Sequence, residues 1–194
     1  MGKIVITTNV TLDGVVEDPD GHEGFARGGW FSQFGGWDLE AWAKIETEEA
    51  LRAKALLLGR RSDEWFATRW LSRTGPWADK LNSMPKYVVS STIKEPRWSN
   101  ATVIASDVVG EVTKLKREIS GEILIYASYR LANTLIENDL VDEVRLVMFP
   151  VVIGSGKHLF TSKRQTPMRL INATTIGDGL TFVTYEVVKT PDTV

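Results

Sequence analysis

The chain has 194 residues and a net charge of −2, with no cysteine and only two histidines. This length suits one domain with a full core, and the lack of cysteine excludes disulfides, thiol catalysis and most zinc-site patterns. The slightly acidic balance argues against a nucleic-acid partner, and no apolar run approaches the ~20 residues that span a bilayer. Because the N-terminus also lacks a signal-peptide pattern, we expect a cytoplasmic, metal-independent protein without nucleic-acid or membrane partners.

Short apolar runs alternate with helical patterns along the chain, and this alternation predicts its fold. Strands are predicted at residues 3–10, 54–59, 86–91, 102–106, 122–127, 141–153 and 169–188. Helices are predicted at 38–54, 77–81, 107–119 and 128–138, with Asp38 and Ser128 as N-caps. The alternation indicates βαβ units, and the IGDGL turn (176–180) indicates an antiparallel C-terminal edge. We therefore predict a single α/β domain over residues 1–190, with a central mixed, mostly parallel sheet flanked by helices.

Residues 11–37 form the one long segment without a predicted helix or strand. They contain seven glycines and five aromatic residues, namely Phe25, Trp30, Phe31, Phe34 and Trp37. A structureless loop of this length is typical of a lid or binding loop, and its aromatic rings could stack on a ligand, Trp37 among them. The alternative, that the aromatic side chains fill a satellite core or a dimer contact, is equally open.

Three strand ends carry groups suited to a phosphate, and ligands of open α/β sheets bind beyond the carboxyl ends of strands. The first is the helix start at Gly59, Arg60, Arg61 and Ser62, where free amides and guanidinium groups could hold a diphosphate. Hydroxyl groups follow the next strand, at Ser90, Ser91 and Thr92. The third is the turn at Ala127 and Ser128, where alanine disfavours the left-handed backbone that glycine allows. Ordinary polar turns would explain each motif taken alone.

Two further groups are candidates for a substrate site. Asp13 follows the first strand and is either a proton-handling carboxylate or a turn residue. Gly154, Ser155 and Gly156 follow the strand at 141–153 and either contact a ligand or form a flexible loop. Neither histidine has a partner at metal-ligand spacing, so we predict no metal site.

Five segments together resemble a known family. VTLDGVVEDP, LLLGRRSDEWF, PKYVVSSTI, ILIYASYRLANTLIENDLVDEVRL and FPVVIGSGKHLF occur in this order between about residues 3 and 187. They resemble the dihydrofolate reductase-like proteins, in particular the C-terminal reductase domain of the riboflavin-biosynthesis deaminase–reductase. The resemblance implies NADPH bound across the strand ends and hydride transfer to a pterin-like or aminopyrimidine substrate, such as 5-amino-6-(5-phosphoribosylamino)uracil.

The resemblance also implies which residues contact the cofactor. They are Gly59, Arg60, Arg61, Ser62, Ser90, Ser91, Thr92, Ala127, Ser128, Tyr129, Arg130 and Leu131. Relatives usually have glycines where this chain has Ala127-Ser128-Tyr129, and often Arg or Lys at the position of Ser91. With these departures, the alternatives that the chain binds NADH, or binds no dinucleotide, stay open.

Two functions follow from this pattern. The first is an NAD(P)H-dependent reductase, linked by kinship to riboflavin biosynthesis. The alternative is a non-catalytic nucleotide- or heterocycle-binding protein that keeps the fold. The apolar run at 144–152 further predicts an edge that pairs with itself in a homodimer.

Overall fold

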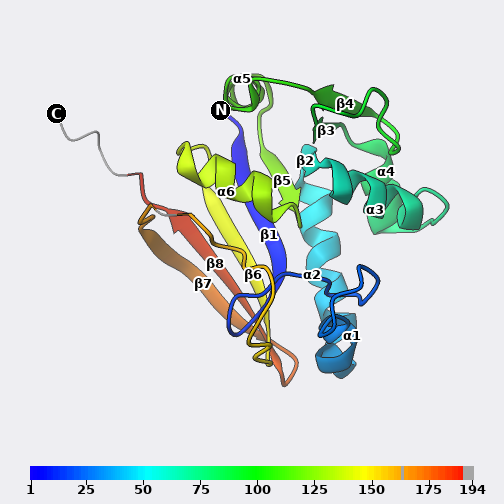
Figure 1. Cartoon of the computed structure of the whole chain (residues 1–194), viewed down its shortest axis with the longest axis vertical. Helices are drawn as coiled ribbons and strands as arrows, with labels where there is room; N and C mark the ends of the chain where they lie inside the picture. Colours follow the sequence, from blue (N-terminus) through cyan, green and yellow to red (C-terminus); the bar gives the residue numbers. More distant parts are fainter. Residues whose placement is uncertain (163, 190–194) are drawn as a thin grey trace.

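The computed structural model describes residues 1–162 and 164–189, which form one sheet flanked by helices (Figure 1). The strands are β1 (Lys3–Thr11), β2 (Ala55–Gly59), β3 (Lys86–Val89), β4 (Ala101–Ile104), β5 (Glu122–Tyr126), β6 (Glu143–Phe149), β7 (Met168–Ile176) and β8 (Leu180–Val187). The helices are α1 (Trp30–Gly35), the 3-10 helix η1 (Gly36–Asp38), α2 (Leu39–Arg52), α3 (Arg60–Trp70), α4 (Pro76–Ser83), α5 (Val108–Glu118) and α6 (Tyr129–Glu137). The predicted domain end, residue 190, lies outside the described residues.

The eight strands are ordered β4-β3-β2-β5-β1-β6-β8-β7. Strands β1 to β6 pair in parallel, whereas β8 runs antiparallel to both β6 and β7. The predicted mixed sheet with an antiparallel C-terminal edge is therefore confirmed. Parallel pairing also places the carboxyl ends of β1, β2, β3 and β5 along one edge of the sheet, where ligands of such folds bind.

Helices cover both faces of the sheet, and the period-two alternation of the strands decides which side chain meets which helix. On β1, Ile4 and Ile6 pack in the cluster beneath α5 and α6, while Val5 packs with α2, α3 and α4 on the other face. The middle strands are thus apolar on both faces, as their continuous hydrophobic runs indicate.

The prediction of a structureless segment at 11–37 was wrong. The segment contains α1 and η1, and its Trp30 side chain is 0% exposed and packs edge-on against Phe149. The Trp30 indole donates to the Glu17 carbonyl over 2.9 Å. Before α1, the carboxylate of Asp18 accepts hydrogen bonds from the amides of Glu23 and Phe25. The buried aromatic residues of the segment therefore fill a satellite core.

Asp38 was predicted to cap α2, but its side chain makes no capping hydrogen bond to that helix. Its carboxylate instead accepts hydrogen bonds from the amides of Asp178 and Gly179, over 3.2 and 2.8 Å. These amides belong to the β7–β8 turn, so the carboxylate fastens this hairpin to the start of α2. The carboxylate thus bonds two amides that are distant in sequence instead of the amides at the start of its own helix.

The self-pairing edge predicted at 144–152 is also corrected, because β6 lies between β1 and β8 and has no free edge. The homodimer itself stays a prediction. Among the described strands, β4 and β7 form the two edges of the sheet.

Candidate functional site

The β2–α3 turn and the β5–α6 turn meet through one hydroxyl group. Ser128 Oγ accepts a hydrogen bond from the Gly59 amide over 3.0 Å and donates one to Ser62 Oγ over 2.7 Å. The two turns can meet because β2 and β5 are neighbours in the sheet. Two of the three predicted phosphate turns therefore form one continuous surface.

The β5–α6 turn has the backbone conformation of a glycine turn although it contains no glycine. Ala127 and Ser128 have φ angles of 51° and 50°, both left-handed. This conformation costs a residue with a Cβ about 1–2 kcal/mol relative to its usual regions. Alanine disfavours this conformation, as the sequence indicated, but the surrounding fold imposes it on Ala127.

Ser128 does not cap α6 with its side chain, contrary to prediction, because its hydroxyl is used between the two turns. Its carbonyl accepts the Ala132 amide over 3.0 Å and so begins the helix. In the first turn of a helix, amides such as those of Tyr129, Arg130 and Leu131 have no intrahelical acceptor, and they attract anions. An anion bound at these amides would displace no helical hydrogen bond.

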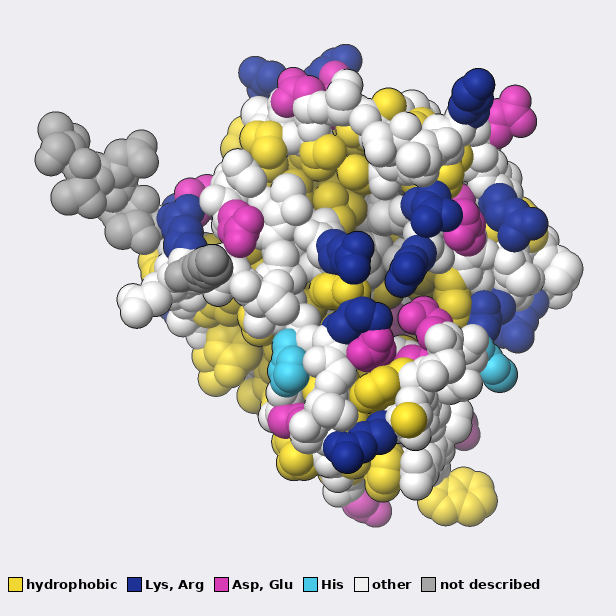
Figure 2. All heavy atoms as spheres, in the orientation of Figure 1, with side chains coloured by type: hydrophobic (Ala, Val, Ile, Leu, Met, Phe, Trp, Pro, Cys, Tyr) yellow, Lys and Arg dark blue, Asp and Glu magenta, His cyan; other side chains and the backbone are white. Residues whose placement is uncertain are grey.

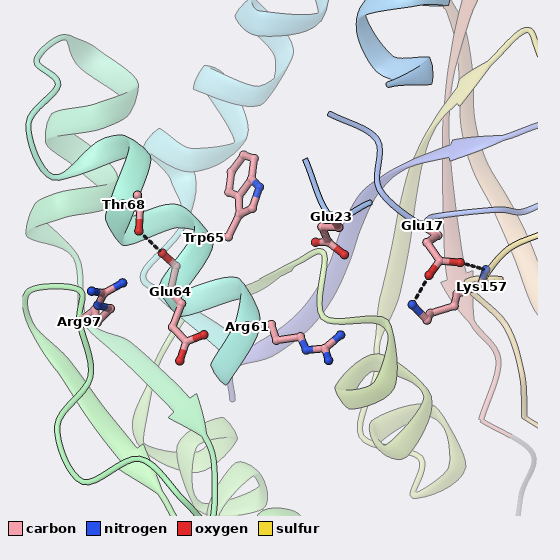
Figure 3. A pocket seen from close by; sticks show the side chains of 8 residues that line it. All are labelled: Glu17, Glu23, Arg61, Glu64, Trp65, Thr68, Arg97 and Lys157. Carbon is pink, nitrogen blue, oxygen red and sulfur yellow. Dashed lines mark hydrogen bonds and ion pairs between the residues drawn. The ribbon is translucent and has the colours of Figure 1, made fainter. Parts of the chain in front are cut away.

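Exposed arginines flank the two turns. Arg60 pairs with Glu64 over 3.2 Å, and Arg130 donates from Nε to the Tyr129 hydroxyl over 3.2 Å. Arg61 extends from the start of α3 into the open space beside it (Figure 3). Because exposed ion pairs of this kind are weak, these guanidinium groups can turn to a bound phosphate at little cost.

The third predicted turn follows β3, which pairs with β2 up to Val89 and Gly59. Ser90 is buried, and its Oγ accepts the amides of Thr92 and Ile93 over 3.2 and 3.1 Å. Its role here is to hold the turn, while Ser91 and Thr92 are exposed. All three predicted cofactor segments thus lie side by side along the same edge of the sheet.

A cleft of about 440 Å³ opens between α3 and the loops that follow β1 and β6 (Figure 3). Its lining combines three cations and three acids with Trp65 and Thr68, namely Arg61, Arg97, Lys157, Glu17, Glu23 and Glu64. Figure 2 shows Lys and Arg side chains gathered around a hollow near the middle of this face. Arg97 and Trp65 were not among the predicted site residues, and only the fold brings them together with Arg61.

The loop between β1 and α1 is tied down on both sides of this cleft. Asp20 accepts hydrogen bonds from Trp65 Nε1 and Arg69 Nη2 of α3, each over 2.9 Å. On the other side, the Val16 amide donates to the Lys157 carbonyl over 2.9 Å, and Lys157 also pairs with Glu17. The loop therefore bridges α3 and the loop after β6.

Asp13 fastens the end of β1 to the loop after β6. Its carboxylate accepts hydrogen bonds from Thr11 Oγ1 over 2.6 Å and from the amides of Ile153 and Gly154 over 3.2 and 2.7 Å. Desolvation opposes its charge, but these hydrogen bonds outweigh desolvation and lower the pKa of Asp13 to about 2. A carboxylate this acidic has no proton to donate near neutral pH, so its catalytic role stays a prediction that the geometry does not favour.

The other predicted substrate residues lie apart. Gly154, Ser155 and Gly156 are exposed in the loop after β6, on the same side as Asp13. The Trp37 side chain is 99% exposed in η1 and lines neither this loop nor the cleft. The structure thus brings Asp13 and the glycine loop together and leaves Trp37 separate.

Two buried acids on α2 were missed by the sequence reasoning. Burial raises the pKa of Glu46 well above its ordinary value, and the nearby Glu49 raises it further. Glu49 accepts hydrogen bonds from Thr7 Oγ1 and Arg145 Nη1, each over 2.9 Å. Their spacing of three residues among the apolar positions of α2 was the available indication, because an acid on that stripe must face the sheet.

In the described part of the chain, no three His, Cys, Asp or Glu side chains gather as a metal ion would require. No helix there combines the length and the apolar character needed to cross a membrane.

Comparison with known proteins identifies the family and supports the fold. The family model described as RibD C-terminal domain matches residues 2–182. The Bacillus subtilis (strain 168) protein YyaP is 29% identical over 189 residues, covering 94% of each chain. RibD of Acinetobacter baumannii superimposes with a TM-score of 0.68 at 12% identity, covering 97% of this chain and 58% of that one. The Enterococcus faecalis dihydrofolate reductase complexed with NADP(H) gives a TM-score of 0.63 at 13% identity, covering 96% and 97%.

Proposed function

Because the chain belongs to the RibD C-terminal domain family, we propose that it is an NAD(P)H-dependent reductase. Its substrate is a heterocycle of the pterin or aminopyrimidine type, such as 5-amino-6-(5-phosphoribosylamino)uracil, which would link it to riboflavin biosynthesis. The observation that carries this proposal is the Ala127–Ser128 turn, which keeps a glycine-like backbone and is held against Gly59 and Ser62 by the Ser128 hydroxyl. A strained conformation that persists without glycine is typical of a functional site.

Each strand-end turn has its own part in this proposal. The amides at the starts of α3 and α6 bind the diphosphate, with Arg60, Arg61 and Arg130 as counter-charges. Exposed Ser91 and Thr92 meet the adenosine end. The bound cofactor supplies the hydride, and the protein supplies position and electrostatics.

NADPH is the expected cofactor, and NADH is the alternative. Ser91 is uncharged at the position where relatives often carry a cation, so a 2′-phosphate would rely on one of the flanking arginines. Comparison of the two dissociation constants measures this preference directly.

Turnover tests the proposal. The purified chain is mixed with NADPH and either the aminopyrimidine ribosyl phosphate or dihydrofolate, and the absorbance of the reduced nicotinamide is followed. Substrate-dependent oxidation that is weakened in Arg60→Ala supports the reductase. Saturable cofactor binding with no oxidation by either substrate would favour the non-catalytic binding protein instead.

The homodimer predicted from the apolar run at 144–152 stays a proposal, although this run has no free edge in the sheet. Light scattering at micromolar concentration decides it, and a monomer mass would count against it.

A further inference from the structure

A buried carboxylate holds Arg97 at the edge of the cleft. Asp63 of α3 is 0% exposed, and its Oδ2 accepts a hydrogen bond from the Arg97 amide over 3.0 Å. The next residue, Trp98, is buried, stacks parallel to Phe66 with ring centroids 5.4 Å apart, and donates to Asn82 Oδ1 over 2.7 Å. The backbone at Arg97 is thus fixed on both sides, while its side chain is exposed and lines the cleft.

A buried cation fixes the end of the same segment, which we call the β3–β4 loop (residues 90–100). Lys86, at the start of β3, is buried, and its Nζ donates to the Ser99 carbonyl over 2.9 Å. The same Nζ lies 4.8 Å from the ring centroid of Trp98. Interactions that are shielded from water in this way are strong, so the loop presents Arg97 at a defined position.

This position is close to the turns proposed to bind the cofactor. Near its start, the β3–β4 loop carries Ser91 and Thr92, which are assigned to the adenosine end. The loop then returns to α3 at Arg97, which lines the cleft together with Glu64 (Figure 3). Glu64 pairs with Arg60 at the start of α3 over 3.2 Å. Arg97 therefore belongs to the same loop as the adenosine contacts and to the same surface as the start of α3.

The 2′-phosphate of NADPH, which NADH lacks, requires a cation at the adenosine end of the cofactor. Ser91 and Thr92 supply only hydroxyl groups, and Lys94 and Arg97 are the two cations of the β3–β4 loop. Arg97 lines the cleft, whereas Lys94 does not. A guanidinium group also forms paired hydrogen bonds with phosphate oxygens, which an ammonium group cannot match. Arg97 is therefore the side chain of this loop best suited to the 2′-phosphate.

We propose that Arg97 binds the 2′-phosphate of NADPH and supplies the positive charge that Ser91 lacks. The inference rests on the proposed function in one respect, that the strand-end turns bind a dinucleotide. Arg60, Arg61 and Arg130 are assigned to the diphosphate, which NADPH and NADH share. Arg97 flanks the adenosine turn instead, so its substitution affects only the cofactor that carries the 2′-phosphate.

Two pairs of ligands that differ in the 2′-phosphate test this role of Arg97. NADPH and NADH form the first pair. Adenosine 2′,5′-bisphosphate and AMP form the second pair, which requires no nicotinamide site. Isothermal titration calorimetry gives all four dissociation constants. Arg97→Gln should weaken the binding of NADPH and of the bisphosphate about tenfold, because a charge-assisted phosphate contact is lost, and should leave NADH and AMP unchanged.

The substitution should not disturb the fold, because Asp63 is bonded to the backbone amide at position 97 and not to the side chain. The Tm of Arg97→Gln should therefore equal that of wild type. Lys94→Gln is the matched control. It removes the same charge from the same loop, at an exposed position outside the cleft lining, and should leave all four dissociation constants unchanged.

Equal wild-type affinities for NADPH and NADH would overturn the inference. A loss in Arg97→Gln that NADH shares, or that Lys94→Gln reproduces, would overturn it as well. Each of these results leaves the proposed reductase standing, because a dinucleotide still binds. Failure of all four ligands to bind would overturn both proposals. A loss confined to the two 2′-phosphate ligands, in a protein that turns over no substrate, would support this role of Arg97 and favour the non-catalytic binding protein over the reductase.

Discussion

Replacing Ala127 by glycine should stabilise the protein, because glycine occupies left-handed backbone without strain. The φ of 51° at Ala127 costs about 1–2 kcal/mol, and glycine would remove this cost. The greater freedom of glycine in the unfolded chain offsets about 0.4–1 kcal/mol of the gain. The difference spans about 0–1.6 kcal/mol and centres on about 0.8 kcal/mol, which is a Tm higher by about 2–3 °C for a chain of this size.

Thermal and urea unfolding measure this change. Ala105→Gly is the matched control, since Ala105 is exposed and is not among the positive-φ residues, so the same substitution there should lower stability. Ala127→Val should be destabilising, because a β-branched residue tolerates this conformation poorly. If Ala127→Gly lowered the Tm as much as Ala105→Gly does, the strain assigned to the turn would be refuted.

Four further predictions follow from the charged groups. Folding depresses the pKa of Asp13 from 3.8 to about 2, so the ionised carboxylate adds about 1–2 kcal/mol to the free energy of unfolding above pH 3.8. This stabilisation is lost as the pH falls toward 2. Asp13→Asn should remove the corresponding pH dependence of the urea midpoint. Arg145→Met should lower the free energy of unfolding, measured in urea, by about 3–5 kcal/mol, because it leaves the carboxylates around Arg145 buried without a counter-charge. If the variant were as stable as wild type, these carboxylates would be uncharged. Because burial raises the pKa of Glu46, the stability of the protein falls as the pH rises above the ordinary carboxyl pKa. Glu46→Gln should therefore have a higher Tm than wild type, by more at about pH 8 than at about pH 5. An equal difference at the two pH values would count against this. Arg60→Ala should weaken dinucleotide binding by about 1–3 kcal/mol with an unchanged Tm, since its pair with Glu64 is exposed; unchanged affinity would remove Arg60 from the site.

The order and type of most elements could be read from hydrophobic periodicity. The predicted helices at 38–54, 107–119 and 128–138 correspond to α2, α5 and α6, with ends that differ by one or two residues. The runs that became β2 and β5 are apolar throughout, which is the pattern of strands covered on both faces. Short-range sequence is enough for such elements.

Features that depend on distant partners could not be read in this way. Asp38 and Ser128 occupy the predicted N-cap positions, but neither side chain caps its helix, because both bind amides far along the chain. The left-handed Ala127 is held by its tertiary surroundings against its own preference. In the candidate site, the motifs placed the three turns on one edge, but Trp65 and Arg97 enter the cleft only through folding.

Titration of NADPH into the purified protein tests the central claim most directly. Trp65 lines the cleft, so energy transfer from tryptophan to the reduced nicotinamide reports binding. We predict saturable binding that is weakened in Arg60→Ala and retained in Ala127→Gly. If the folded protein bound neither NADPH nor NADH, the strand-end turns would not be a dinucleotide site and the proposed reductase would be contradicted.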